Sequence, residues 1–408
     1  METNELAKDS VAVVLAGGKG ARLRALTRTV CKPALPFGAA YRNIDFSLSN
    51  CVNSGIRRIG VATQHKPELL LKHIDGVWHR AGSGSGEFVA AWPAEQRAPT
   101  QGYRGTADAV FRNLEAIERL NCRFVLVLGG DHVYKMDYRP MLECHRQQQA
   151  DVTVGCVQVE VDEAKQFGIL SVDGCGRIQR FVEKPKTVAE LPDGDRVLAS
   201  MGIYVFDAHF LADVLRRDAF SSQSQHDFGG DILPNLVRDA RVFAYPFRER
   251  GGQPGYWRDV GTPAAYWRAH LELLDSSPSL RLDDALWPLP AVGKAPTLTA
   301  RHARSNSEGD GGVSLVADDC VIGGTVSRSV LFSGVRIYEG TSVESSVILP
   351  GAVVGRDCRL HGTIIDSDCR IPDGTVIEAT RHGDALASLE PIVVTVDDFS
   401  ADLAYSCG

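Results

Sequence analysis

Aliphatic residues recur every five or six positions in the C-terminal quarter of the chain, and this repeat restricts the fold more than any other feature of the sequence. From "VADDCVIGGTV" to "CRIPDGTVI", over residues 316–377, a Val, Ile or Leu returns at that spacing, and Gly, Asp or Ser fills the gaps. This pattern is typical of a parallel β-helix, in which each turn buries its aliphatic side chains only by stacking on the next. An ordinary antiparallel β domain is the alternative. We predict a left-handed β-helix over residues 313–408.

The first two thirds of the chain follow a different rhythm. Short β-rich runs alternate with segments of helical length, such as Ala107–Leu120, whose apolar residues recur at helical spacing. This alternation indicates crossover connections and a mostly parallel, Rossmann-like α/β sheet over residues 1–275. The run over 276–312, rich in Ser, Pro, Gly and Asp, predicts a linker. The candidate strands are Val11–Leu15, Ile59–Thr63, Phe124–Leu128, Val152–Val159, Gly202–Phe206 and Val242–Phe247.

Composition argues against several classes of function. The 408 residues carry a formal net charge of −7, whereas a nucleic-acid-binding protein is expected to be basic. No apolar run approaches the ~18 residues of a membrane span, and the polar N-terminus does not resemble a signal peptide. Ten cysteines are scattered without a C-x-x-C pair, as expected for free thiols in a reducing compartment. We therefore expect a cytoplasmic protein without nucleic-acid or membrane partners.

A glycine-rich turn, "VVLAGGKGARL", follows the first predicted strand. Gly17, Gly18 and Gly20 lack a Cβ, so the backbone can approach a ligand and point N–H groups at it. The Arg22 guanidinium can bind phosphate oxygens, and Lys32 follows ten residues later. The turn is neither a Walker A loop nor a G-x-G-x-x-G fingerprint. It predicts a phosphate site, against the alternative of a glycine-rich surface turn with two cations.

Two aspartates lie where a metal ion could join such a site. Asp131 follows the buried run "FVLVLGG", and Asp259 lies in "YWRDVGT". Mg²⁺ is usually held by one or two carboxylates together with substrate phosphates. A role as an ordinary turn residue is the alternative for Asp131.

Two further segments carry groups suited to a phosphate site. "YRGTADAV" is a second glycine turn that opens a helix, and Gly105 with Thr106 is expected to cap that helix. "FVEKPK" places Glu183 and Lys184 after another predicted strand. A solvated turn is the alternative for the second segment.

Ten motifs, in order along the chain, carry a family resemblance. They are "LAGGKGARL", "KPALPFG", "IDFSLSN", "NSGIRRI", "YRGTADAV", "GGDHVYKMDY", "FGIL", "FVEKP", "SMGIYVF" and "YWRDVGT". Together with the hexapeptide repeats, they resemble the glucose-1-phosphate adenylyltransferases, or ADP-glucose pyrophosphorylases, of bacterial glycogen synthesis. The resemblance implies adenylyl transfer from ATP to glucose 1-phosphate, Mg²⁺ as the cofactor and a homotetramer.

The resemblance also implies a role for each residue that matches a family motif. The nucleotide-binding residues would be Leu15, Ala16, Gly17, Gly18, Lys19, Gly20, Gln64, Gln96, Gly105 and Thr106. Glucose 1-phosphate would meet Tyr103, Gly168, Glu183, Lys184 and Ser200. The catalytic residues would be Arg22, Lys32, Asp131, Lys184 and Asp259, of which Asp131 and Asp259 would hold the metal.

The implied reaction suits these residue types. A phosphate oxygen of glucose 1-phosphate would attack the α-phosphorus of ATP in line, and pyrophosphate would leave. A phosphate monoester is already an adequate nucleophile, so no Ser–His or Cys–His pair is needed, and none is evident. Catalysis is expected to consist of positioning and charge neutralisation.

The chain departs from the family pattern where anionic effectors are held. The family usually has two basic residues before "AKPA", whereas this chain has Thr29, Val30 and then Cys31. After the last repeats, family members usually have the sequence "DARRF", whereas in this chain Asp384 is followed by Ala-Leu-Ala. Weakened or altered activation by sugar phosphates is our hypothesis, and drift at surface loops is the alternative. The remaining candidate effector cations are Arg28, Arg42 and Arg381.

Three other functions remain open from the sequence. The same fold would serve a UDP-, dTDP- or GDP-sugar pyrophosphorylase, because the choice of base does not follow from motif spacing. A non-catalytic regulatory subunit of a hetero-oligomer is a second alternative, against which the complete set of charged site residues argues. An acyltransferase in the β-helix is a third, but His361 is the one histidine inside the repeats and is expected to be a structural residue.

Overall fold

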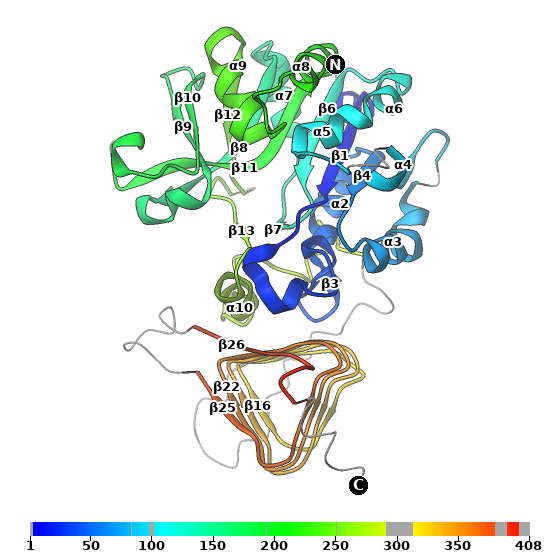
Figure 1. Ribbon diagram of the computed structural model, residues 1–408, viewed down its shortest axis with the longest axis vertical. Helices are drawn as coiled ribbons and strands as arrows, with labels where there is room; N and C mark the ends of the chain where they lie inside the picture. Colours follow the sequence, from blue (N-terminus) through cyan, green and yellow to red (C-terminus); the bar gives the residue numbers. More distant parts are fainter. Residues whose placement is uncertain are drawn as a thin grey trace. The chain divides into compact units, whose positions relative to one another are not determined.

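The computed structural model describes residues 3–82, 84–97, 102–192, 194–249, 251–290, 313–379 and 390–399. The chain forms two compact units that alternate along the sequence (Figure 1). The first unit takes its residues from Met1–Gly18 and Phe46–Trp257, and the second from Lys19–Asp45 and Arg258–Gly408.

The first unit is built on one twisted sheet, which has nine strands in the described residues. The order is β10-β9-β11-β6-β1-β4-β5, and β8 joins β11 to β12. Strands β6, β1, β4 and β5 run parallel to one another, as do β8 and β12, whereas β11 runs antiparallel to β6, β8 and β9. The strands are β1 (Ser10–Ala16), β4 (Arg58–Thr63), β5 (Phe88–Pro93), β6 (Phe124–Gly129), β8 (Val152–Glu160), β9 (Gly168–Val172), β10 (Ile178–Glu183), β11 (Arg196–Asp207) and β12 (Val242–Pro246).

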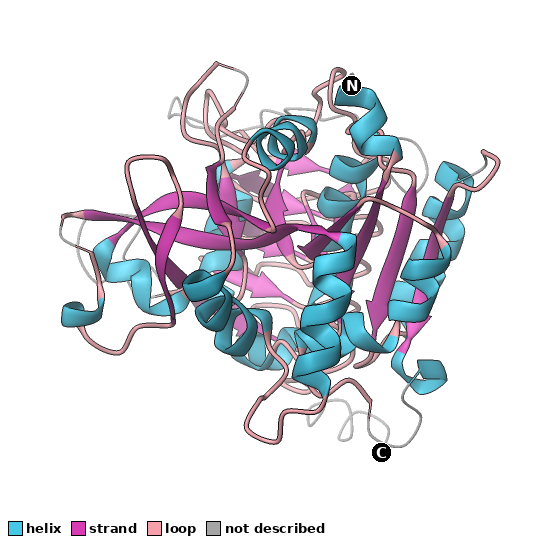
Figure 2. Cartoon of the chain, turned by 90° about the horizontal axis from the view of Figure 1, so that it is seen from above, coloured by secondary structure: helices cyan, strands magenta, loops and turns pink. Residues whose placement is uncertain are grey.

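All six strands expected from the sequence are present in this sheet. The first three of them, β1, β4 and β6, lie in its parallel part. Val11–Val14 of β1 and Val125–Leu128 of β6 are fully buried, because helices cover both faces of a parallel sheet (Figure 2). The helices of this unit are α1 (Thr3–Lys8), the main part of α2 (Asn43–Asn53), α3 (Glu68–His73), α4 (Ala94–Arg97), α5 (Thr106–Arg112), α6 (Leu114–Arg119), α7 (Arg139–Gln147), α8 (Ala208–Ala219) and α9 (Leu233–Asp239). Shorter elements are η3 (Ile74–Trp78), η4 (His79–Gly82), β7 (His132–Tyr134), η5 (Val161–Gln166), η6 (Val188–Glu190) and η7 (Phe228–Ile232).

The single helix expected over Ala107–Leu120 is instead two helices, α5 and α6. The chain leaves helical geometry at Asn113, where φ is −104° and ψ is 5°. The Asn113 Nδ2 donates to the Ala109 carbonyl at 2.8 Å and to the Tyr103 hydroxyl at 3.0 Å. A buried Asn that bonds to the preceding turn and to Tyr103 competes with the helix, and apolar spacing does not reveal this break.

The C-terminal part of the second unit is the predicted left-handed parallel β-helix, drawn in yellow to red in Figure 1. Its strands stack in three parallel sheets, and from β16 to β25 residues 17 apart lie above one another, as Ser329, Ser346 and Thr363 do. Between β14 and β17 the spacing is 15 residues. Each turn therefore spans three of the short aliphatic repeats. The first sheet consists of β14 (Leu315–Val316), β17 (Val330–Leu331), β20 (Val347–Ile348), β23 (Thr363–Ile365) and β26 (Ile392–Val394). The second consists of β15 (Val321–Ile322), β18 (Arg336–Ile337), β21 (Val353–Val354) and β24 (Arg370–Ile371). The third consists of β16 (Thr325–Ser327), β19 (Ser342–Glu344), β22 (Arg359–His361) and β25 (Val376–Glu378).

The rest of the second unit packs on this β-helix. It comprises η1 (Ala21–Thr27), η2 (Lys32–Ala34), β2 (Pro36–Phe37), β3 (Tyr41–Arg42), most of β13 (Trp257–Asp259) and α10 (Pro263–Glu272). The fully buried Trp267 of α10 donates its indole N–H to the Ser345 carbonyl at 2.8 Å. In the segment predicted as a linker, Leu280, Leu282 and Trp287 are buried, and the residues from 291 to 312 lie outside the described part.

Two expectations from composition can be compared with the described residues. The nine cysteines described there are free thiols, and five of them are buried. None of the helices described has the length and apolar character that a membrane crossing requires.

Candidate active site

The glycine turn follows β1 directly and presents an open backbone. A Cβ added at Gly17 would contact the Gln64 Cβ at 3.4 Å, whereas one added at Gly18 would have no atom within 4 Å. Leu15 and the buried Ala16 form the end of the strand that supports this turn. The backbone of Gly18 is therefore accessible to a ligand.

Gln64 links the end of β4 to the turn that precedes α5. Its Oε1 accepts a hydrogen bond from the Tyr103 N–H at 2.9 Å. Gly102 has φ +66°, and a Cβ there would lie 2.8 Å from the Gln64 Nε2. The side chain of Gln64 thus spans from the Gly17 turn to the Tyr103 turn. Gln96 lies on α4 with an exposed side chain, and no hydrogen bond in the described residues ties it to either turn.

The Tyr103 side chain is a buried anchor of its turn. Its hydroxyl donates to the Trp92 carbonyl at 2.9 Å and accepts from Asn113. Only 8% of the residue is exposed. A contact of Tyr103 with a sugar would therefore have to come from the rest of the residue rather than from its hydroxyl.

The expected helix cap lies at Gly105, whereas the Thr106 side chain bonds elsewhere. Gly105 occupies the cap position of α5, but no side chain there bonds to the first turn. The Thr106 hydroxyl instead donates to Asp227 Oδ2 at 2.9 Å and accepts from the Phe228 N–H at 2.9 Å. A Cβ at Gly105 would overlap the His226 carbonyl, so this glycine allows the two segments to approach closely.

Asp131 lies at the carboxyl end of β6, as the sequence predicted. Its side chain is 32% exposed, and the His132 Nε2 lies 3.7 Å from its Oδ1. The His132 ring packs edge-on against Trp257, with ring centroids 5.0 Å apart. The N–H of Gly130 donates to the Leu15 carbonyl at 2.9 Å, so the Asp131 loop is bonded to the strand that carries the glycine turn.

Glu183, Lys184 and Gly168 meet at the ends of the β9–β10 hairpin. Gly168 is paired with Glu183, and its Cβ would lie 2.9 Å from the Glu183 Oε2. Lys184 has φ +46° and places its Nζ 2.5 Å from the Glu183 Oε1. A Cβ at Gly229 would lie 2.6 Å from the Glu183 Oε2. The Glu183 carboxylate is therefore surrounded by two glycines and one exposed cation.

Ser200 lies at an irregularity in β11. The register with β8 shifts between Ser200 and Ile203, and Gly202 within this bulge has φ +67°. The N–H of Gly202 approaches the Ser200 hydroxyl at 3.3 Å. Bulges of this kind redirect side chains beside binding sites.

In the second unit, Asp259 holds two cations. The Lys32 Nζ lies 2.5 Å from its Oδ1, and the Arg22 guanidinium lies 3.0 Å from its Oδ2. The side chain of Lys32 is 6% exposed and that of Arg22 is 52% exposed. Gly20 has φ +61°, and a Cβ there would lie 3.3 Å from the Lys32 Cβ. Lys19 is exposed at the start of this segment.

The candidate effector cations in the described residues already have partners. Arg28 forms an ion pair with Asp397. Arg42 donates to the Ala34 carbonyl, and burial lowers the pKa of its guanidinium despite the nearby Asp45. Arg381 lies outside the described residues.

Asp131 in the first unit and Asp259 in the second each offer a carboxylate, which is a donor type that Mg²⁺ takes. No three His, Cys, Asp or Glu side chains of the described residues gather closely enough to hold a metal by themselves. Mg²⁺ keeps several waters and takes one or two carboxylates plus phosphate oxygens, so such a cluster is not required. Asp131 is partly exposed in the first unit, and Asp259 carries cations that phosphates could also bind in the second.

Sequence reasoning missed Asp227, which connects the start of α5 to the start of η7. Its Oδ2 accepts from Thr106, and its Oδ1 accepts from the N–H groups of Gly229 and Gly230. An Asp followed two residues later by Gly-Gly at the start of a helix is a capping signal that could have revealed it.

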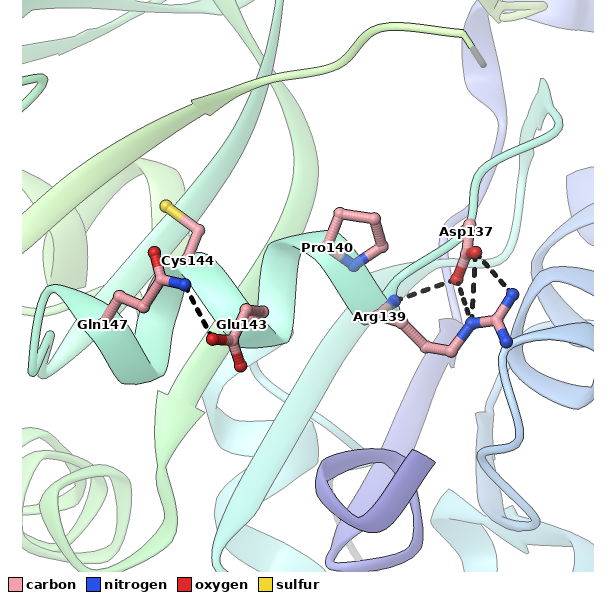
Figure 3. A pocket seen from close by; sticks show the side chains of 6 residues that line it. All are labelled: Asp137, Arg139, Pro140, Glu143, Cys144 and Gln147. Carbon is pink, nitrogen blue, oxygen red and sulfur yellow. Dashed lines mark hydrogen bonds and ion pairs between the residues drawn. The ribbon is translucent and has the colours of Figure 1, made fainter. Parts of the chain in front are cut away.

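A pocket on α7 is a competing candidate (Figure 3). It is lined by Asp137, Arg139, Pro140, Glu143, Cys144 and Gln147. Its charged groups bond within α7 and its flanks, because Arg139 pairs with Asp137 and Gln147 donates to Glu143. It includes none of the candidate site residues, although Asp137 belongs to the motif "GGDHVYKMDY".

Comparison with known proteins matches both parts of the chain. A family model described as "Nucleotidyl transferase" matches residues 11–276, and one described as "GlmU-like, C-terminal hexapeptide" matches residues 296–389. The glucose-1-phosphate adenylyltransferase of Methylobacillus flagellatus is 48% identical over 380 residues, which cover 91% of this chain and 89% of that protein. The proteins of that name from Nitrosococcus oceani and Hydrogenovibrio crunogenus are 47% and 45% identical, over 92% and 97% of this chain and 90% and 95% of their own lengths.

Proposed function

This chain belongs to the glucose-1-phosphate adenylyltransferase family of nucleotidyl transferases. We propose that it uses the residues described above to bind ATP and glucose 1-phosphate and to form ADP-glucose. The observation that carries this assignment is the placement of Gln64, Gly17 and Asp131. These residues follow β4, β1 and β6, three adjacent parallel strands, at their carboxyl ends. Ligands of open α/β sheets bind at that edge.

The reaction requires two anionic substrates to meet in line. A phosphate oxygen of glucose 1-phosphate forms a bond to the α-phosphorus of ATP, the bond from that phosphorus to the bridging oxygen breaks, and pyrophosphate leaves. Gly17, Gly18, Lys19 and Gly20 surround the triphosphate, while Gln64 and the Gly105–Thr106 turn border the adenosine. The family motifs predict that Leu15, Ala16 and Gln96 also bind the nucleotide.

The charged groups divide between the two substrates. Arg22 and Lys32, which Asp259 holds in the second unit, bind the triphosphate of ATP, and Lys184 binds the phosphate of glucose 1-phosphate. Glu183 accepts hydrogen bonds from sugar hydroxyls beside Gly168 and Gly229, where the absence of side chains leaves room. Tyr103 and Ser200 complete the sugar-phosphate set.

Family enzymes use a divalent metal ion, and we assign Mg²⁺ to Asp131 and Asp259. When bound, Mg²⁺ would neutralise charge on the phosphates and orient them for the displacement. The protein's own contribution is to supply two carboxylates and three cations, whose charges lower the barrier without a covalent intermediate.

Regulation by anionic metabolites is proposed to be weak or altered in this chain. Thr29, Val30 and Cys31 provide no charge, and the described candidates Arg28 and Arg42 already bond within the second unit. Strong activation by fructose 1,6-bisphosphate in a titration would contradict this. We further propose a cytoplasmic homotetramer, to be checked by light scattering of the purified protein.

One assay tests the function against its alternatives. Pyrophosphate release is measured with glucose 1-phosphate and each of ATP, UTP, dTTP and GTP, with and without Mg²⁺. We expect release with ATP and Mg²⁺ only. Release with another nucleotide would favour a different sugar-nucleotide pyrophosphorylase, and no release by the lone chain would favour a regulatory subunit. Asp131→Asn should abolish release while the protein stays folded.

A further inference from the structure

Helix α2 carries a row of buried polar side chains. Ser47, Asn50 and Ser54 follow one another at spacings of three and four, so they share one side of the helix and its C-terminal extension. Ser47 and Asn50 are fully buried, and Ser54 is 1% exposed. Buried hydroxyl and amide groups destabilise a fold unless they are hydrogen-bonded, so this row requires partners.

All three side chains bond to one segment, residues 129–138. The Ser47 Oγ donates to the Gly129 carbonyl at 2.7 Å. Asn50 donates to the Tyr134 carbonyl at 3.2 Å and accepts from the Met136 N–H at 3.0 Å. These contacts satisfy main-chain groups of a segment that leaves the sheet at the end of β6.

Two further contacts extend the same attachment. Ser54 accepts from the Tyr138 N–H at 2.8 Å. The hydroxyls of Tyr134 and Tyr138 lie 2.6 Å apart, and the Tyr134 hydroxyl lies 3.4 Å from the Ser47 Oγ. The row on α2 therefore fixes the segment at several points along its length.

Asp131 lies inside this segment, two residues after the carbonyl that Ser47 holds. On the other side, the N–H of Gly130 donates to the Leu15 carbonyl of β1. The peptide group between Gly129 and Gly130 is thus bonded to two different elements: its carbonyl to α2 and its N–H to β1. Gly129 and Gly130 have no side chains that could restrict the backbone by packing, so these hydrogen bonds restrain the backbone that leads into Asp131.

We propose that Ser47, supported by Asn50, is a positioning residue that holds the Asp131 carboxylate in place for the divalent metal. This inference rests on the proposed function, because it takes Asp131 as a metal ligand. Residues that orient metal ligands without touching the metal commonly change metal affinity about 10- to 100-fold when they are removed.

The test measures Mn²⁺ binding to the full-length protein in the presence of α,β-methylene-ATP, by electron paramagnetic resonance. Ser47→Ala removes only the hydroxyl that bonds Gly129. We expect about tenfold weaker Mn²⁺ binding and faster amide hydrogen exchange in residues 129–138. Ser47→Thr keeps the hydroxyl and should retain binding close to that of the wild type.

Ser49 provides the matched control. It lies on the same helix, is 1% exposed, and its hydroxyl has no hydrogen-bond partner in the described residues. Ser49→Ala should leave Mn²⁺ affinity and hydrogen exchange unchanged. Equal affinities of the Ser47→Ala and Ser49→Ala variants would overturn the positioning role. If Ser47→Ala does not fold, Ser47→Cys, which keeps the shape but weakens the hydrogen bond, takes its place.

A third variant separates this inference from the proposed function. Asp131→Asn should lose Mn²⁺ binding. If it binds Mn²⁺ as tightly as the wild type, Asp131 is not a ligand, and both the metal assignment and the role of Ser47 are wrong. If Asp131→Asn loses binding while Ser47→Ala does not, the inference about Ser47 alone is wrong.

Discussion

Asp259 forms ion pairs with two cations of the second unit that are far from it in the sequence. It lies 227 residues from Lys32 in sequence, yet the two charges are 2.5 Å apart, and the Lys32 side chain is almost completely buried. Arg22 adds a second, more exposed cation. One carboxylate with two cations leaves a net positive charge, which suits an anionic triphosphate.

Lys32→Met should separate the catalytic and structural roles of this pair. Removing the ammonium leaves Asp259 without its buried cation, so we expect a loss of about 3 kcal/mol of stability in denaturant unfolding. Turnover should fall by about 10²–10³-fold if Lys32 makes the charge contact to the transition state that we propose. The double variant Lys32→Met/Asp259→Asn should regain stability but not turnover. A single variant with wild-type turnover would contradict the catalytic role.

His270 is a buried residue whose hydrogen bonds define a neutral ring. Its Nδ1 lies 2.9 Å from the Tyr266 carbonyl, to which it donates, and its Nε2 accepts from the Gly38 N–H at 3.3 Å. Burial lowers the pKa of His270 to about 4, against a bond to Tyr266 that favours the charged form. A proton on Nε2 would face the N–H of Gly38, so protonation breaks this contact.

Stability should therefore depend on pH through His270. In the unfolded chain this histidine takes up a proton near its ordinary pKa of 6.5, whereas the folded ring stays neutral down to about pH 4. The contribution is fully present above pH 6.5 and is lost at ~1.4 kcal/mol per pH unit as the pH falls toward 4. His270→Gln should show a shallower decline in urea unfolding between pH 6.5 and about 4.5. Parallel curves for the two proteins would refute this linkage.

At the scale of elements, two glycines illustrate different reasons for lacking a side chain. Gly105 starts α5 in an extended conformation, with φ −164°, and a Cβ there would lie 2.5 Å from the Gln225 carbonyl. Gly18, after β1, has open space around its Cβ position. The close packing of α5 against the Gln225–His226 backbone leaves no room for a side chain at Gly105. No contact in the described residues excludes a side chain at Gly18.

The two alanine variants should consequently behave differently. Gly105→Ala should destabilise the protein by about 1–3 kcal/mol, because backbone must shift, and should raise KM for ATP. Gly18→Ala should leave the denaturant midpoint unchanged, because a Cβ there meets no other atom within 4 Å. The variant should have a higher KM for ATP, because the added methyl group would lie between the turn and the bound ligand. A Gly18→Ala variant with unchanged KM would show that no ligand approaches this backbone.

At the scale of the whole molecule, the compact units do not follow the order of the chain. Lys19–Asp45 and α10 belong to the unit that contains the β-helix. Trp267 donates to Ser345 and is fully buried, and the ring of His270 lies 5.8 Å from that of Phe332. The boundary at residue 275 stays a prediction, and the structure suggests how to test it.

A fragment of residues 1–275 should not fold into an active enzyme. It contains almost all of the nucleotidyl transferase match but would expose Trp267 and His270, which the β-helix covers. We expect an aggregating fragment without cooperative thermal unfolding and without pyrophosphate release. A soluble fragment that unfolds cooperatively would show that the first 275 residues form an independent domain.

The sequence predicted the parts of the fold whose cause is local. The β-helix follows from a short repeat, because every turn buries the same kind of aliphatic residue. Strands β1 and β6 follow from continuous apolar runs, and the glycine turn after β1 follows from its residue types. The family assignment was also predicted from motifs and is confirmed by the relatives. The roles of the individual site residues stay predictions.

Tertiary structure alone decided which distant groups meet. Pairs such as Lys32–Asp259, Thr106–Asp227 and Ser47–Gly129 are separated by 227, 121 and 82 residues. The break at Asn113 likewise depends on the Tyr103 hydroxyl reaching its side chain. Periodicity in a sequence records which residues are buried and in what local geometry. The partner that satisfies a buried charge or hydroxyl is selected only when the packed elements bring it within hydrogen-bond distance.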